Sequence, residues 1–179
     1  MSAAAHSAHA PVLLDGAGQI VGQDRWRFLD AEQGIEDAAD IVLDLGRLEQ
    51  SGDQLARRNG RLGVALQPGE AVERLAPWLD RLALIAIAFP SFKDGRGMSS
   101  ARILRARMGF AGEIRAIGDV LIDQLGFMLR CGFSAFALRH PDPQAAFAAA
   151  MARFPLHYQT ASAGIPAIPG LRHKEAPNS

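Results

Sequence analysis

The sequence predicts an α/β fold of about five β-strand–α-helix units that form a parallel sheet. Three observations predict it: five short apolar runs, a helix-compatible segment after each run, and loops rich in glycine or proline between them. This alternation is typical of right-handed βαβ units. Because a closed barrel needs eight units, we expect either an open doubly wound sheet or an incomplete barrel. Strand order decides between the two.

Each unit can be placed along the chain. The runs that predict strands are 41–45, 62–66, 84–89, 113–117 and 133–138. The segments that predict helices are 47–58, 71–81, 99–108, 119–131 and 141–154. Ser99 or Ser100 is a good N-cap for the third helix and Asp119 for the fourth, while Gly132 stands where the fourth helix should end.

The two ends of the chain differ from the repeating middle. Short β-type pieces at 12–14, 19–21 and 25–28, separated by turn residues, predict a small N-terminal β-hairpin. Residues 1–10 are expected to be disordered, and residues 11–154 to form a single α/β domain. Residues 155–179 hold four prolines and two glycines without periodicity, which predicts a flexible C-terminal tail.

Composition narrows the classes of function. Basic and acidic residues number 19 each, so no overall field draws the chain to nucleic acid or to an anionic membrane. We therefore expect neither nucleic acid nor a membrane as a partner. No apolar run reaches the roughly 20 residues of a membrane helix. The first ten residues do not read as a secretion signal. The single cysteine excludes an internal disulfide. A cytoplasmic location is therefore expected.

The densest group of polar residues follows the third predicted strand, where a charged, glycine-rich loop leads into a helix. Backbone N–H groups and the helix dipole favour anions at such a place. In parallel α/β proteins this is also the edge of the sheet where ligands bind. The predicted anion-binding residues are Lys93, Gly95, Arg96, Gly97, Ser99, Ser100 and Arg102, with Arg139 from the loop after the last strand.

Two carboxylates are candidates for acid–base catalysis, and each has a structural alternative. Asp94 could orient Arg96 toward an oxyanion, or the two could form an ion pair that only shapes the turn. Asp119 fits the N-cap of a helix better than a catalytic acid. Cys131 fits a small buried residue better than a nucleophile.

No cofactor motif is present in the chain. The glycines around Arg96 do not form the dinucleotide pattern G-x-G-x-x-G, so the sequence offers no motif for a nicotinamide or flavin nucleotide. One cysteine cannot supply an iron–sulfur cluster or a cysteine-rich zinc site within one chain. The histidines are too scattered to predict a metal site. No cofactor is assigned.

Four segments carry a resemblance to a known family. They are Phe89-Pro90-x-Phe92-x-Asp94-Gly95-Arg96-Gly97-x-Ser99, Ala101-Arg102-x-Leu104-Arg105, Arg115-Ala116-x-Gly118-Asp119-Val120-Leu121-x-Asp123-Gln124 and Arg130-Cys131-Gly132-Phe133. Together they resemble the proteobacterial family called domain of unknown function 934. Members of that family are usually encoded beside assimilatory sulfite reductase and are often labelled as oxidoreductases of sulfite reduction. The family brings no established catalytic residue.

The resemblance implies an accessory protein or oxidoreductase component of assimilatory sulfite reduction, with sulfite reductase as a possible partner. The residues themselves support an alternative. That alternative is a small-molecule enzyme acting on a substrate that bears a phosphate or a sulfur oxyanion, bound at the carboxyl ends of the strands. Sulfite is a small oxyanion, so the two hypotheses share a ligand chemistry. Whether the chain is an enzyme stays open at this point.

Overall fold

The computed structural model describes residues 10–35, 37–91 and 94–153. The predictions made for residues 1–9, for Lys93 and for the tail at 155–179 lie outside these ranges. None of the helices in the described part of the chain is long and apolar enough to cross a bilayer.

The centre of the fold is a seven-stranded, mostly parallel sheet with the order β1-β7-β6-β5-β4-β3-β2. The strands are β1 (Val12–Asp15), β2 (Arg27–Phe28), β3 (Ile41–Asp44), β4 (Leu62–Leu66), β5 (Leu82–Phe89), β6 (Glu113–Gly118) and β7 (Ala135–Leu138). From β3 to β7 each strand pairs in parallel with the next one along the chain. A doubly wound sheet reverses its strand order at a switch point, and this run does not. The sheet is therefore an incomplete barrel, curled like half of one.

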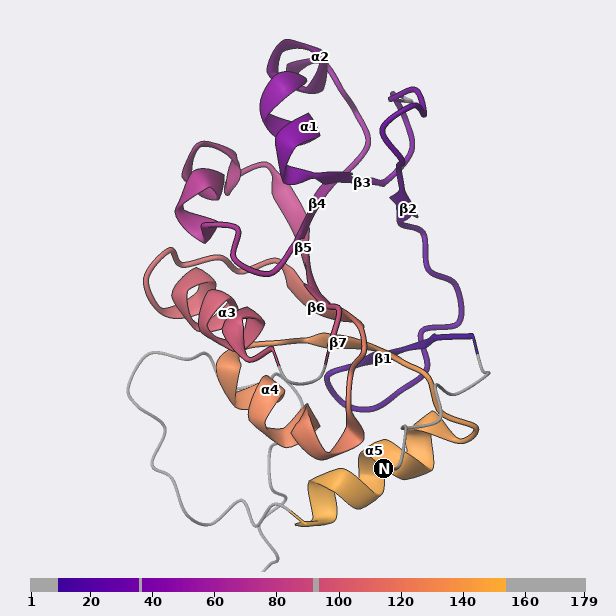
Figure 1. The fold of residues 1–179 in the computed structure, drawn as a ribbon. Coiled ribbons are helices and arrows are strands. Elements are labelled where there is room, and N and C mark those ends of the chain that lie inside the picture. The colour runs from indigo at the N-terminus through magenta and orange to yellow at the C-terminus, as the bar shows by residue number, and fades with distance from the viewer. Residues whose placement is uncertain (1–9, 36, 92–93, 154–179) are drawn as a thin grey trace, which may run out of the picture.

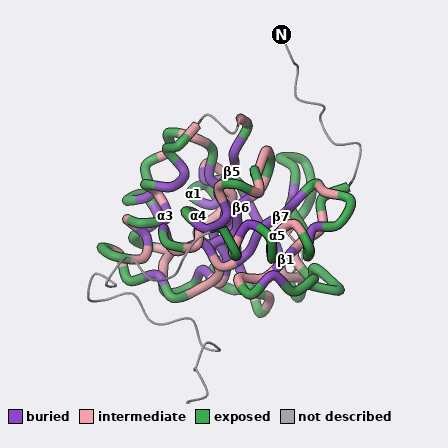
Figure 2. Tube along the Cα trace, turned by 90° about the horizontal axis from the view of Figure 1, so that it is seen from below, coloured by how far each residue is buried: buried purple, intermediate pink, exposed green. Residues whose placement is uncertain are grey.

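Helices follow the strands, and α1, α3 and α4 lie on the same side of the sheet (Figure 1). They are α1 (Leu45–Gln50), α2 (Gly52–Ala56), the 3₁₀ helix η1 (Val72–Trp78), α3 (Arg96–Ala106), the 3₁₀ helix η2 (Ile122–Gln124), α4 (Leu125–Cys131) and α5 (Pro143–Arg153). Alternate residues of the central strands pack against these helices in one apolar cluster. Figure 2 shows the buried strands in the middle of the molecule, with exposed residues around them.

The N-terminal part corrects the predicted strand count. Seven strands form where five were expected, because β1 and β2 join opposite edges of the main sheet. The predicted hairpin is reduced to a single antiparallel bridge between Leu14 and Ile20. β1 instead pairs antiparallel with β7 along its whole length, from Val12 opposite Leu138 to Asp15 opposite Ala135. Pairing with a strand edge satisfies more backbone groups than a short local turn does.

Several helix boundaries also differ from the prediction. The segment 47–58 forms two short helices, and α1 begins at Leu45 because Asp44 caps it, its carboxylate accepting the Arg47 N–H at 2.8 Å. The segment 71–81 forms a 3₁₀ helix that contains Pro77. Asp119 is not an N-cap, because η2 begins three residues later, after an extended Leu121. Gly132 does end α4, with the positive φ of +105° that favours glycine.

The third helix, α3, begins at Arg96 rather than at Ser99 or Ser100. Asp94 explains the earlier start, since its carboxylate accepts the Arg96 N–H at 3.1 Å and its own N–H donates to the Ser91 carbonyl at 3.0 Å. The turn is thus closed before either serine. Gly97 follows at a place where a Cβ atom would lie 2.7 Å from the Phe89 ring, so α3 sits directly against β5.

The other face of the sheet is partly closed by the N-terminal arm, which we define as the described residues between 16 and 40. Arg115 alternates with the core residues Ile114 and Ala116, so its side chain points away from the helices. It lies only 3% exposed and donates to Asp24 of the arm at 2.6 Å and to Glu113 at 2.7 Å. Burial alone would lower the pKa of Arg115, but these two hydrogen bonds outweigh it and raise the pKa.

Candidate functional site: a groove between α3 and α4

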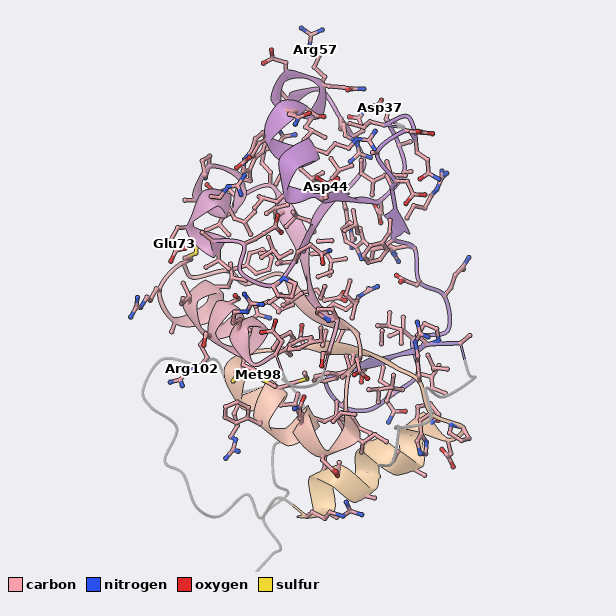
Figure 3. The ribbon with its side chains drawn as sticks, viewed as in Figure 1. Asp37, Asp44, Arg57, Glu73, Met98 and Arg102 are labelled. Carbon is pink, nitrogen blue, oxygen red and sulfur yellow. The ribbon has the colours of Figure 1, made fainter. Side chains whose placement is uncertain are left out.

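A groove of about 500 Å³ runs between α3 and the η2–α4 segment. The residues that line it are Gly95, Met98, Ser99, Arg102, Asp123, Gln124, Phe127 and Cys131. Met98 and Arg102 both lie on the side of α3 that faces α4 (Figure 3). The groove therefore begins at the loop that the sequence singled out and continues along the helix that follows.

Arg105 fixes the spacing of the two groove walls. Its side chain donates to the carbonyl of Gly132 at 3.0 Å, and to those of Phe110 and Gly112 at 2.6 and 2.7 Å. These bonds join α3 to the C-terminal end of α4 and to the start of β6, and burial lowers the pKa of the guanidinium. The N–H groups of Arg105 thus bond to backbone carbonyls within the protein, whereas the Arg102 side chain, three residues earlier, is exposed.

The floor of the groove is formed by Met98 and Cys131, both buried. Burial raises the pKa of the Cys131 thiol, and the positive charges of Arg102 and Arg130 offset only part of that effect. A thiol of this kind is protonated at neutral pH and is a poor nucleophile. The prediction of a small buried residue at Cys131 is confirmed.

The outer wall of the groove exposes a large aromatic side chain. Phe127 is 45% exposed, and the Arg130 guanidinium lies 5.7 Å from the centre of its ring. On the same side, Asp123 forms an ion pair with Arg153 of α5, with the Asp123 Oδ1 and Arg153 Nη1 atoms 3.3 Å apart. This wall thus exposes the apolar Phe127 ring beside the cation of Arg130, while the Asp123 carboxylate is paired with Arg153.

The structure brings three of the predicted ligand residues, Gly95, Ser99 and Arg102, into this groove. Gly97 is buried below it, against β5. Ser100 is half-buried, and its hydroxyl donates to the Arg96 carbonyl at 3.3 Å. Helical periodicity explains the selection, because positions 95, 98–99 and 102 share one face of α3.

Arg96 and Asp94 form the ion pair that was the structural alternative. The Arg96 Nε and Nη2 atoms lie 2.9 and 2.6 Å from the two Asp94 carboxylate oxygens, and the Arg96 side chain is 65% exposed. Hydrogen bonds from the side chain and backbone of Arg96 lower the pKa of Asp94 to about 2. Asp94 is therefore ionised throughout the neutral range. The remaining face of the guanidinium approaches Gly69, in the loop after β4.

Arg139 and Asp119 follow the ends of β7 and β6, and neither is among the described residues that line the groove. The Asp119 N–H donates to the Phe89 carbonyl at 2.6 Å, which fastens the end of β6 to β5. The groove thus does not unite Arg96, Asp119 and Arg139. In the described part of the chain, no group of three or more His, Cys, Asp or Glu residues is placed to hold a metal ion.

The sequence reasoning missed Met98 and Phe127. Periodicity marks both as apolar positions of helices, and it cannot show that one becomes the floor and the other an exposed wall. That depends on how α4 is rotated against α3, which is set by non-local contacts such as those of Arg105.

The fold and groove define the class of protein: an α/β half-barrel with an open, arginine-bearing groove between two helices on its outer face. Residues 63–168 match the family described as "Bacterial protein of unknown function (DUF934)", and the chain belongs to this family. The matched region contains both walls of the groove and the strands β5 to β7. A search of curated proteins finds no match.

Proposed function

We propose that this chain is an accessory protein of assimilatory sulfite reduction that binds sulfite reductase. The family resemblance implies the process, and one observation carries the role. Of the eight residues that line the groove, six belong to the segments on which the resemblance rests: Gly95, Ser99, Arg102, Asp123, Gln124 and Cys131. Segments separated in the sequence thus contribute to one surface feature.

The form of that feature favours a partner protein. The groove is open along two helices, and Phe127 exposes apolar surface at its edge. Exposed apolar surface rimmed by polar groups is typical of protein–protein contacts. A buried thiol on the floor adds no reactive group of its own.

A deletion strain tests the proposal. We expect the strain to grow slowly when sulfate or sulfite is the sole sulfur source and normally on cysteine, and we expect the tagged full chain to co-purify with sulfite reductase. The cysteine medium controls for a general growth defect. Unchanged sulfite reduction in the deletion strain, together with no association with the reductase, would refute the proposal.

A second candidate function is an enzyme acting on a substrate with a phosphate or sulfur oxyanion. Ser99 and Arg102 favour it, because they stand one helical turn apart on one groove wall and both carry hydrogen-bond donors. Lys93, Arg96 and Arg139 remain predicted ligands of such a substrate, and Asp94 and Asp119 its candidate acid–base groups. This candidate is distinguished from the first by direct ligand binding.

Thermal unfolding of the full chain in the presence of sulfite, sulfate, phosphate, flavin or nicotinamide nucleotides separates the two candidates. A ligand at 100 times its dissociation constant stabilises a folded protein by about 2.7 kcal/mol, a readily measured shift. A shift that disappears in Arg102→Ala would support the enzyme. No shift with any of these compounds would favour the accessory protein.

A further inference from the structure

We infer that the α3–α4 groove docks an acidic surface of the partner protein, with one bulky apolar side chain of that surface seated against Phe127. The inference rests on the proposed function and deepens it, because it names the contact face and the chemistry of the surface that the face recognises. Charge and apolar exposure carry it independently.

The two helices that form the groove carry only positive charge. The sequences of α3 and α4 contain arginines at 96, 102, 105 and 130 and no acidic residue, and Arg107 follows at the end of α3. Arg105 donates inward and Arg96 pairs with Asp94. The side chains of Arg102, Arg107 and Arg130 are exposed. Asp123 is the acidic residue among those that line the groove, and it pairs with Arg153. The groove and its rim therefore present an excess of positive charge to an approaching molecule.

This excess is local, because the chain as a whole is neutral. Residues 11–60 contain ten acidic residues against five arginines, whereas residues 94–153 contain eight arginines against five acidic residues. Asp37 and Asp44 lie at the end of the molecule away from Arg102 (Figure 3). Such a separation orients an acidic partner toward the groove during approach, and it repels that partner from the other end.

The apolar part of the groove has the size and position of an anchor site. Two large apolar side chains are exposed here, Phe127 of α4 at 45% and Leu121, directly before η2, at 36%. The buried Met98 lies beneath the groove, whose volume of about 500 Å³ accommodates one large side chain. Arg130 next to Phe127 adds a cation at the rim. An aromatic residue beside an arginine is a common centre of binding energy in protein interfaces.

Binding of the full chain to purified sulfite reductase tests this inference, with two groove variants and two matched controls. Phe127→Ala should weaken binding about 30-fold, the loss for an anchor residue. Arg102→Glu should weaken it at least about tenfold at low salt, and by less at high salt because charges are then screened. The controls are Phe28→Ala, which removes an equally exposed ring on β2, and Arg57→Glu, which reverses an exposed charge after α2. Both should bind like the unmodified chain.

The possible outcomes distinguish failure of this inference from failure of the proposed accessory role. If the unmodified chain binds and the groove variants bind equally well, the inference is wrong while the accessory role stands. If the unmodified chain does not bind, the inference is wrong, and the accessory role fails as well when the deletion strain reduces sulfite normally. If light scattering shows that the chain is a dimer that Phe127→Ala converts to a monomer, a second copy occupies the groove and the inference is also wrong. Circular dichroism verifies that each variant is folded.

Discussion

Arg115 and Arg96 both pair with carboxylates, but one pair lies inside the molecule and the other on its surface. Arg115 is 3% exposed and joins Glu113 to Asp24, a residue 91 positions away. Arg96 is 65% exposed and joins a residue two positions away. The first cluster holds the N-terminal arm on the sheet, whereas the second closes the turn before α3. The charges of a glycine-rich loop can thus pair with each other, as those of Asp94 and Arg96 do. The exposed Arg102 is a better marker of the open groove than Arg96 is.

The largest effect is expected from Arg115→Ala. Removing this buried cation leaves two carboxylates facing each other and releases the arm. The free energy of unfolding should fall by about 3 kcal/mol. This is the low end of the usual loss, because both carboxylates are about a third exposed. Urea denaturation measures it. Arg107→Ala, a change at an exposed residue directly after α3, is the control and should have little effect. Equal losses in the two variants would contradict the difference drawn here between buried and surface arginines.

A smaller effect is expected from Asp24→Ala, which removes the arm's side of the same cluster. Arg115 keeps its bond to Glu113, so we expect a loss of about 1 kcal/mol. Hydrogen exchange should show faster exchange of the arm amides, including Arg27 N–H, which donates to the Asp40 carbonyl, while β5 keeps its protection. Exchange that quickens equally in β5 would mean that the arm does not open separately.

The smallest effect on stability is expected from Arg96→Ala. The pKa of Asp94 should rise from about 2 toward the ordinary value of 3.8, as followed by NMR titration of its carboxyl carbon. A carboxyl group whose pKa is lowered by folding contributes stability above its unfolded pKa of 3.8 and loses it as the pH falls through about 2. The variant should therefore be slightly less stable than the unmodified chain above about pH 4, and this difference should disappear as the pH falls through about 2. An unchanged Asp94 titration would show that the pair does not form in solution.

The strands were the most predictable part of the fold, and the reason is local. The central strands β4 and β5 are continuous apolar runs because both of their faces are covered or crowded, and such runs stand out in a sequence. In β6, Glu113 and Arg115 alternate with apolar residues. β2 is two residues long and exposed, and the β-type piece predicted at 25–28 did not show that it joins the edge of the main sheet beside β3. The partner of β1 lies more than a hundred residues away, and local turn residues favoured a hairpin instead.

The candidate site was predictable to the same limited extent. Ser99 and Arg102 follow from the loop-to-helix signal, although the cap assigned to Ser99 was wrong because Asp94 closes the turn first. Phe127 could not be found, since its exposure is a property of how two helices meet. Arg102 and Arg105 look alike in the sequence, and only the carbonyl groups around Arg105 distinguish them.

The pairing of β1 with β7 imposes an order of events on folding. β3 to β7 each find their neighbour in the next strand along the chain, so that part of the sheet can grow as the ribosome delivers it. Asp15 pairs with Ala135, 120 positions later, so β1 waits until β7 has been synthesised. In that interval the edge of β7 and the charge of Arg115 are uncovered, which makes the nascent chain vulnerable to edge-to-edge association. The first strand to leave the ribosome is thus among the last to enter the sheet.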